Sequence, residues 1–235
     1  MRIVKAAEIR RQELLDCAVR LFATQGYEDT SIHQIISELG ISKGAFYHHY
    51  SSKEDLVEAL ACRYAEEAAT RARHVLEDPS LDAFERLSIF LSRLRASKLE
   101  TEPGLLAAFR PILLPGNSQL YDRSQSAIAS VIRPILEGII AEGVADRTFD
   151  TSDAGEAAEL ILHLMRTTRE PLVGLVTAGS QRDFDAALER LVVRLRFIGT
   201  VIDRMLGIPE GSIELIDQSI LDCVAGPWRR SISAA

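Results

Sequence analysis

The chain has 235 residues, of which 47% are hydrophobic and 26% are charged, and its formal net charge is −7. This is the composition of an ordinary globular protein with ample material for a hydrophobic core. The sequence contains no run of 18 apolar residues, and its first five residues lack the apolar core of a secretory signal, which excludes an apolar membrane-spanning helix and predicts a cytoplasmic protein.

The acidic net charge does not exclude DNA binding. Residues 1–50 contain six lysines and arginines against six aspartates and glutamates, so the whole negative excess lies in residues 51–235. Salt screens charges beyond about 8 Å under physiological conditions, so local charge governs an encounter with phosphate. We therefore expect a weakly basic DNA-binding face with modest affinity for non-specific DNA.

The first predicted helix covers residues 9–25 and ends at Gly26. Its apolar positions recur at helical spacing: Leu14, Leu15, Ala18, Leu21 and Phe22. Residues 1–8 show no such periodicity, which predicts an arm that reaches toward phosphates or a disordered end. The three cysteines, Cys17, Cys62 and Cys223, lack metal-ligand spacing and are expected to be free thiols.

A second, shorter helix is predicted to start near Ser31. Its apolar stripe at i, i+3, i+4 and i+7 consists of Ile32, Ile35, Ile36 and Leu39. Ser31 and Gln34 have the spacing of a capping box, and Thr30 is an equally good cap one residue earlier. Gly40 is expected to end this helix, because glycine takes the left-handed conformation without steric cost.

A third helix follows at once, with Ser42 as its cap. Two helices joined by a turn of about four residues form a helix-turn-helix. The third helix offers a cation, two small residues, a phenol and two imidazoles: Lys43, Gly44, Ala45, Tyr47, His48 and His49. Phe46 and Tyr50, four residues apart, are predicted to point inward. Such a helix can enter the major groove of DNA, and a pair of helices packed in an ordinary bundle is the alternative.

Residues 11–56 resemble a known family. The matching motifs are L-F-x-x-x-G-Y at the end of the first helix, T-S before the second, L-G-I-S-K-G at the turn, F-Y-H-H-Y on the third and S-K-E-x-L at the start of the fourth. The segment is similar to the DNA-binding domain of TetR-family transcriptional regulators. The resemblance implies an all-α homodimer, with a helix-turn-helix domain over residues 1–52 and a helical effector-binding and dimerisation domain over residues 53–235.

The predicted DNA-binding residues all lie in this segment. They are Thr30, Ser31, His33, Ser42, Lys43, Gly44, Ala45, Tyr47, His48, His49 and Lys53. The resemblance places Tyr47, His49 and Lys53 at positions that contact the DNA backbone. The residues predicted to lie closest to base edges, which specify sequence, are His33, Lys43, Ala45 and His48.

The rest of the chain predicts further helices. Their expected bounds are Lys53–Leu76, 81–98, a short helix within 105–114 that Pro111 ends or kinks, 118–142 with a kink at Pro134, 153–170 ended by Pro171, 183–206, and 212–224. The resemblance implies that Lys53–Leu76 is the lever that transmits effector binding to the DNA-binding domain.

The predicted helix over residues 183–206 has more than one apolar face. Four residues widen its main stripe: Val192, Val193, Phe197 and Val201. A helix with a second apolar face must bury it, so we predict a homodimer in which residues 153–170 and 183–206 of two copies form a four-helix bundle. An aspartate at Leu195 or Ile202 is expected to separate the two copies.

A small-molecule site is predicted where the helices between residues 81 and 170 converge. Its candidate lining residues are Leu94, Phe109, Leu113, Tyr121, Ile128, His163 and Arg166. An apolar cavity with a few polar groups is typical of such sites, and core packing is the alternative for each residue. His163 is expected on the buried side of its helix. An anionic ligand is the alternative that the helix arginines favour: Arg110, Arg123, Arg166 and Arg169.

The sequence contains no G-x-x-x-x-G-K-[ST] or H-E-x-x-H motif and no paired cysteines. We therefore expect neither an enzyme nor a bound cofactor or metal. The sequence predicts a DNA-binding repressor that a small apolar or amphipathic ligand releases from a palindromic operator. The alternative is a DNA-binding regulator without such an effector, controlled by a protein partner or by its abundance.

Overall fold

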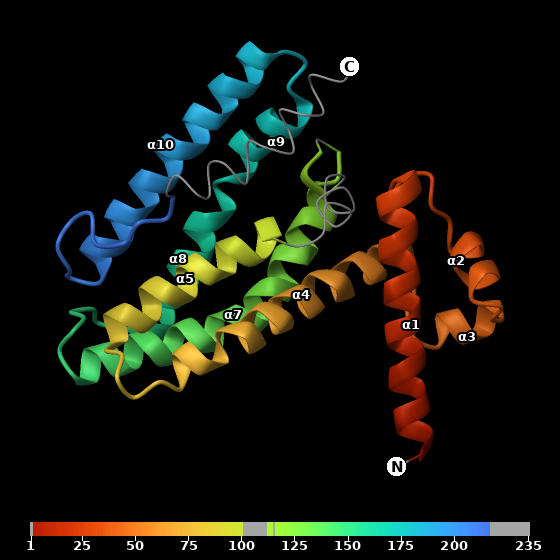
Figure 1. Ribbon diagram of the computed structural model, residues 1–235, viewed down its shortest axis with the longest axis horizontal. Coiled ribbons are helices and arrows are strands. Elements are labelled where there is room, and N and C mark those ends of the chain that lie inside the picture. Colours follow the sequence, from red (N-terminus) through yellow and green to blue (C-terminus); the bar gives the residue numbers. More distant parts are fainter. Residues whose placement is uncertain (1, 101–111, 115, 217–235) are drawn as a thin grey trace. The chain divides into compact units, whose positions relative to one another are not determined.

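A computed structural model describes the backbone of residues 2–100, 112–114 and 116–216, and the side chains within 7–92, 112–114 and 116–216. Over these residues every regular element is a helix, which confirms the all-α prediction. The helices labelled in Figure 1 are α1 (Arg2–Gln25), α2 (Ile32–Glu38), α3 (Lys43–Tyr47), α4 (Lys53–Leu76), α5 (Ala83–Glu100), α7 (Ser118–Ala145), α8 (Ala154–Arg166), α9 (Arg169–Thr177) and α10 (Gln181–Met205).

The chain forms two compact units. The head unit consists of the described residues of Met1–Tyr64 and Thr101–Ala127, and the body unit of those of Ala65–Glu100 and Ile128–Ala235. Both α4 and α7 therefore contribute residues to each unit.

In the head unit, α2 packs against α1 and α3 packs against α2 (Figure 1). Large apolar side chains that are almost fully buried form its core: Leu14, Phe22, Ile35, Phe46, Leu56 and Leu60. These side chains come from α1, α2, α3 and α4, and their packing fixes the helix-turn-helix against α1 and the start of α4.

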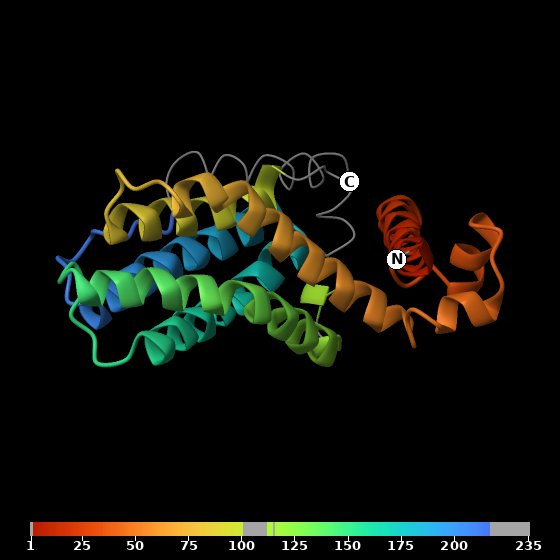
Figure 2. The same ribbon diagram turned by 90° about the horizontal axis from the view of Figure 1, so that it is seen from below.

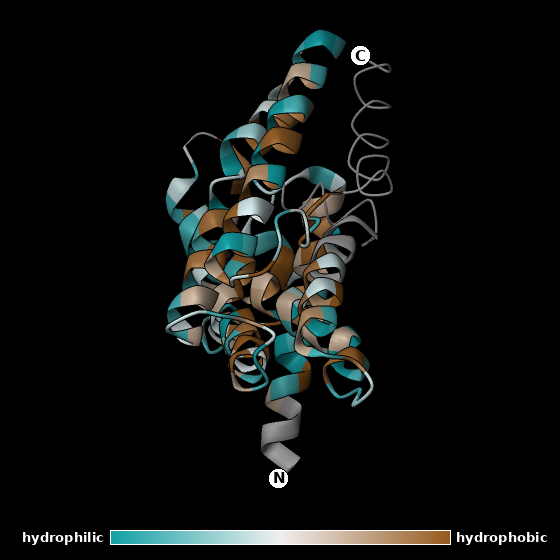
Figure 3. Ribbon diagram, turned by 90° about the vertical axis from the view of Figure 1, so that its left-hand side faces the viewer, coloured by the Kyte–Doolittle hydropathy of each residue, from teal (hydrophilic) through white to brown (hydrophobic). Residues whose placement is uncertain are grey.

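In the body unit, α10 packs against α8 and α9, and these helices lie beside the body portions of α5 and α7 (Figure 2). The largest buried side chains of its core include Leu87, Phe90, Leu136, Ile161, Phe184 and Ile202. Figure 3 shows hydrophobic residues interleaved with hydrophilic ones along the helices, as amphipathic packing requires. Within the described part of the chain, no helix combines the length and the apolarity that crossing a membrane needs.

The prediction for the N-terminal residues was wrong, because α1 already begins at Arg2. Residues 2–8 contain neither proline nor glycine to interrupt a helix. Glu8 lies 3.8 Å from Arg11 and accepts a hydrogen bond from Gln12 at 2.9 Å. Such contacts across one turn stabilise the beginning of α1, which lies before the apolar stripe of that helix.

The ends of two predicted helices also differ. The helix predicted over residues 81–98 begins at Ala83 as α5, because Asp82 and Glu85 accept each other's backbone N–H at 2.8 and 2.9 Å. The helix predicted over residues 118–142 is α7, which continues through Gly143 to Ala145. A Cβ at Gly143 would lie 2.1 Å from the Phe149 ring, so this glycine admits the buried phenyl group. The predicted kink at Pro134 stays a prediction.

The predicted helix over residues 153–170 is two helices. α8 ends at Arg166, where the hydroxyls of Thr167 and Thr168 donate to carbonyls of the preceding turn at 2.6 Å. Pro171 does not end a helix but stands in the first turn of α9. Proline is tolerated there, because the first-turn N–H groups have no partner within a helix.

The last predicted helix is not helical over its described residues. Residues 212–216 run without a helix, with Ile213 and Leu215 buried. The fully buried carboxylate of Asp203 accepts the N–H of Gly211 at 2.7 Å and that of Ile213 at 2.9 Å. This carboxylate holds the chain after α10 in a turn. Residues 217–224 of the prediction lie outside the described residues.

Candidate nucleic-acid interface

The first helix of the motif, α2, is fixed at both ends by local contacts. Ser31 Oγ accepts the N–H of Gln34 at 3.2 Å, and Gln34 Oε1 accepts the N–H of Ser31 at 2.7 Å, which confirms the capping box. Gly40 follows the helix with φ = +62°, the left-handed conformation predicted there. Ile35 is fully buried, so the apolar stripe of α2 faces the core of the head unit.

The second helix, α3, has only five residues and depends on the core beneath it. Ser42 Oγ accepts the N–H of Ala45 at 3.1 Å, which confirms the predicted cap. Phe46 is fully buried and Tyr50 is 5% exposed, with ring centres 6.2 Å apart. The predicted inward anchors are therefore correct, and Phe46 fixes which side of α3 faces outward.

The outward side of the motif carries polar groups and a phenol. Its exposed residues are Ser31, His33, Ser42, Lys43, Gly44, Tyr47 and His48, while Ala45 and His49 are half-buried. Tyr47 is 47% exposed, and the Lys43 ammonium lies 5.7 Å from the centre of its ring. Hydroxyl, ammonium and imidazole groups are donors suited to phosphates and base edges.

Permanent positive charge near this side is sparse. Arg20 forms a 2.6 Å ion pair with Glu38, whereas Lys43 forms no ion pair with a described residue. The imidazole rings of His48 and His49 lie 5.1 Å apart. Burial first, and then His48 and the arginines of α1, lower the pKa of His49, which favours its neutral imidazole.

Two predicted contact residues point elsewhere. Thr30 is 1% exposed and its hydroxyl donates to the Gly26 carbonyl at 2.7 Å, so it neither caps α2 nor offers its side chain to DNA. The Lys53 ammonium donates to the carbonyls of Tyr27 at 2.7 Å and Thr30 at 3.0 Å. Both side chains hold the loop before α2.

Comparison with known proteins agrees with this geometry. The family model of bacterial regulatory proteins of the tetR family matches residues 14–60. The repressor AcnR of Corynebacterium diphtheriae is 37% identical over 113 residues, which cover 44% of this chain and 58% of AcnR. The repressor KstR2 of Rhodococcus jostii is 36% identical over 161 residues, which cover 68% of this chain and 76% of KstR2.

The chain belongs to the TetR family. A crystal structure from Syntrophomonas wolfei, assigned to TetR-family transcriptional regulators, has the same fold with a TM-score of 0.57 and 21% identity, over 81% of this chain and 95% of that one. TetR-family regulators are DNA-binding proteins rather than enzymes. The chain spans little more than half of the length of AcnR, and the matched residues 14–60 lie in the head unit.

Within the head unit of this TetR-family protein, Arg123 connects α7 to the start of α4. Its guanidinium donates to Asp55 at 2.6 Å and to Glu58 at 2.8 Å. Hydrogen bonds from Ser51 and then from Arg123 lower the pKa of Asp55 to about 2. Asp55 thus links the turn after α3 to α7. From the sequence, Arg123 was a candidate for binding an anionic ligand. No local pattern indicates its actual partners, which lie 65 and 68 residues earlier in the chain.

The predicted effector-binding residues that the structure describes belong to both units. Leu113 and Tyr121 pack in the head core, whereas Ile128 packs against the body core. The prediction for His163 was wrong: its side chain is 56% exposed and its Nδ1 lies 3.2 Å from Glu159 Oε1. Arg166 is half-buried at the end of α8. The side chain of Leu94 and all of Phe109 lie outside the described residues.

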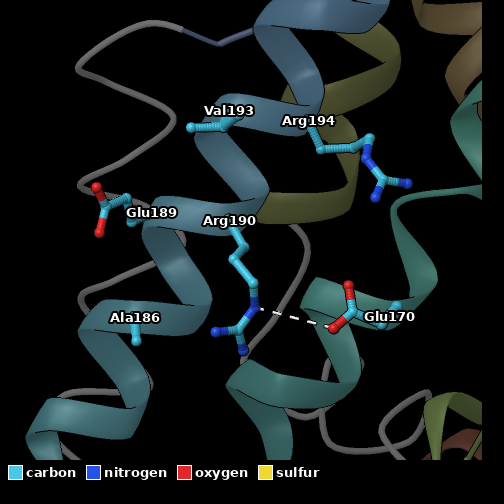
Figure 4. A pocket seen from close by; sticks show the side chains of 6 residues that line it. All are labelled: Glu170, Ala186, Glu189, Arg190, Val193 and Arg194. Atoms are coloured by element: carbon cyan, nitrogen blue, oxygen red, sulfur yellow. Dashed lines mark ion pairs between the residues drawn. The ribbon is translucent and has the colours of Figure 1, made fainter.

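A shallow hollow of about 380 Å³ lies between α9 and α10 on the body unit (Figure 4). Its lining residues are Glu170, Ala186, Glu189, Arg190, Val193 and Arg194. Glu170 faces Arg190 across it at 3.8 Å. None of the predicted effector-binding residues lines this hollow, and its charged walls do not suit an apolar ligand.

Proposed function

We propose that this TetR-family chain is a homodimeric transcriptional repressor that binds a palindromic operator through α2 and α3. The observation that carries the proposal is the arrangement of α3, in which Phe46 is fully buried while Lys43 and Tyr47 are exposed. A helix held by its inner side and polar on its outer side can enter the major groove. The repressor names of AcnR and KstR2 support the same role here.

We divide the roles within residues 1–52, the proposed DNA-binding domain, by their exposure. The side chains proposed to lie nearest base edges are His33, Lys43, Ala45 and His48. Tyr47 and His49 are proposed to contact the DNA backbone, together with the hydroxyls of Ser31 and Ser42 and the backbone at Gly44. Phosphate contacts fix the position of the motif, and base contacts specify the sequence.

Selection of bound DNA from a randomised pool tests this function. The unmodified protein is expected to enrich a two-fold symmetric sequence, because the two heads of a dimer read equivalent half-sites. Lys43→Gln is expected to change the preferred base at one position of each half-site, by about 1–3 kcal/mol of discrimination. If the unmodified protein enriched no sequence, the proposal would be contradicted. If Lys43→Gln preferred the same bases as the unmodified protein, Lys43 would not contact a base edge.

Exposed apolar side chains on two neighbouring helices of the body unit support a homodimer. Leu160 on α8 is 51% exposed, and Val193 and Phe197 on α10 are 61% and 65% exposed. By contrast Leu195 and Ile202 are 6% and 0% exposed and face the core of their own chain. An aspartate at Leu195 or Ile202 would therefore unfold the body unit rather than separate two copies, which corrects the sequence-based choice of test sites.

We propose that an apolar or amphipathic effector binds residues 53–235 and releases the operator. Ser88 on α5 supports a polar anchor for such a ligand, because its buried hydroxyl has no hydrogen-bond partner among the described residues. A buried unpaired hydroxyl costs about 1–3 kcal/mol, which a ligand acceptor would recover. DNA binding fixes the spacing of two heads at about 34–36 Å, so a ligand that favours another spacing weakens it.

Ligand titration with and without operator tests the coupling. Because linkage is reciprocal, operator DNA is expected to weaken effector binding by the same factor, about 5- to 150-fold. Ser88→Ala is expected to weaken the effector while leaving operator affinity unchanged. Thermal-shift screening supplies the ligand, since a molecule that binds the folded state stabilises it. Equal ligand affinities in both titrations would favour a regulator without an effector.

Operator binding is expected to strengthen by about three- to tenfold as the pH falls from about 8 to about 6. The pKa of His49 is lowered in the free protein by burial and by the neighbouring His48, Arg10 and Arg11, with Glu8 opposing them. Nearby phosphates favour the charged imidazole, so binding takes up a proton and gains affinity at lower pH. Titrations at constant ionic strength measure this effect, and His49→Gln should flatten the dependence.

A further inference from the structure

Lys53 is the first residue of α4, and its ammonium is turned toward the loop between α1 and α2. The Nζ atom lies 2.7 Å from the carbonyl oxygen of Tyr27, 3.4 Å from that of Glu28 and 3.0 Å from that of Thr30. It also lies 4.0 Å from the centre of the Tyr27 ring. An ammonium has three N–H donors, so these carbonyls take up its whole donor capacity.

The position of Lys53 in α4 makes these contacts informative. A cation at the N-terminus of a helix is disfavoured by the helix dipole, whose positive end lies there. Three carbonyl oxygens and the face of an aromatic ring offset that repulsion. The charge of Lys53 is therefore balanced inside the head unit rather than presented to a phosphate.

The loop that Lys53 holds leads directly into the DNA-reading motif. Tyr27 is 5% exposed and its hydroxyl donates to Glu54 Oε1 at 3.2 Å, while Thr30 is 1% exposed. The carbonyl of Thr30 belongs to the peptide unit that enters Ser31, the cap of α2. Because α3 packs against α2, the position of this loop sets where the outward residues of α3 lie.

We infer that Lys53 is a positioning residue, which orients α2 and α3 through the carbonyls of residues 27–30 and does not bind DNA phosphate. The inference rests on the proposed function, because the motif must bind DNA for its orientation to matter. It departs from the phosphate contact that the family resemblance implies for this lysine. The two roles give different salt dependence and different tolerance for arginine.

Operator binding by the full-length protein is measured as a function of salt for Lys53→Met, Lys53→Arg and, as a control, Lys43→Gln. We expect Lys53→Met to lose about tenfold or more in affinity at every salt concentration, with an unchanged slope of log K against log salt. Lys53→Arg keeps the charge, but its planar guanidinium does not match three converging carbonyls, so it should lose a similar factor. Lys43→Gln removes a cation that is proposed to lie in the major groove near the phosphates, so it should reduce the slope, by up to about 0.9 for one neutralised phosphate.

A measurement on the unmodified protein does not depend on how the variants fold. Reductive methylation of lysines is followed by mass spectrometry with and without operator. Lys53 should react slowly in both states, because its half-buried ammonium is hydrogen-bonded to three carbonyl oxygens, whereas Lys43 should react rapidly when free and be protected by DNA. Far-ultraviolet circular dichroism checks that each variant is folded at the binding temperature.

Three outcomes would overturn the inference. The first is a salt slope for Lys53→Met that falls as it does for Lys43→Gln. The second is wild-type affinity for Lys53→Arg, and the third is rapid methylation of free Lys53 with protection by DNA. Failure of the unmodified protein to bind any operator would instead contradict the proposed function.

Discussion

Phe197→Asp is expected to make the protein monomeric and to lower its operator affinity by about a hundredfold or more. Phe197 is 65% exposed on α10, one turn from Val193, which is 61% exposed. Large apolar side chains in such positions are the ones that carry most of the binding energy when an interface covers them. A carboxylate at the centre of that interface would lose its water without gaining a partner. Because a palindromic operator needs two heads at a fixed spacing, loss of the dimer is also loss of tight binding.

Sedimentation equilibrium at micromolar concentration and an operator titration measure the two effects together. Phe197→Leu is the matched control, since it keeps an apolar side chain at the same site and should remain dimeric. Leu195→Asp is a second control that should lower thermal stability instead, because Leu195 is only 6% exposed within its own chain. A Phe197→Asp protein that stays dimeric would place the interface on another surface.

The helix-turn-helix was predictable because each of its signals acts over a few residues. Ser31 forms a capping box with Gln34, three residues later, and Ser42 accepts the N–H of Ala45, also three residues later. Gly40 is favoured by the left-handed backbone conformation at its own position. The same holds for Phe46, whose inward direction follows from helical spacing. Local interactions of this kind are encoded in the sequence at the place where they act.

Contacts between residues far apart in the sequence were not predictable from local patterns. The family resemblance places Lys53 at a phosphate-contacting position, whereas its carbonyl partners in the structure lie 23–26 residues earlier in the chain. The turn after α10 depends on the buried Asp203, which no periodicity distinguishes from a surface carboxylate. Pro171 was interpreted as an end of a helix, although a proline suits the first turn of a new helix equally well.

The candidate effector-binding residues were chosen by assuming where helices converge, and for His163 that assumption was wrong. His163 was expected to face inward from its neighbours in sequence, yet α8 buries Ala157, Ala158 and Ile161 and turns His163 outward. Which side of a helix faces a cavity depends on tertiary packing of several helices at once, and an apolar stripe locates only the core.

Phe46→Ala is expected to destabilise the head unit by about 3–5 kcal/mol and thereby to abolish operator binding near physiological temperature. Phe46 is 0% exposed, and its ring lies 5.3 Å from that of Tyr47 and 6.2 Å from that of Tyr50. A five-residue helix has too few hydrogen bonds to form alone, so α3 exists because this side chain is buried. Removing this ring leaves a cavity in the core, and the exposed residues of α3 lose the buried contact that orients them.

Tyr47→Ala is the matched variant, because it removes the neighbouring aromatic ring from the other side of α3. Tyr47 is 47% exposed, so its loss should change the free energy of unfolding by no more than about 1 kcal/mol, mainly through the lost ring contact with Phe46. Operator affinity should nevertheless fall, since the phenol is proposed to contact the DNA backbone. Chemical denaturation and operator titration of both variants separate the two roles. If Tyr47→Ala proved as unstable as Phe46→Ala, or if Phe46→Ala bound DNA normally, the division of α3 into an anchoring side and a reading side would be wrong.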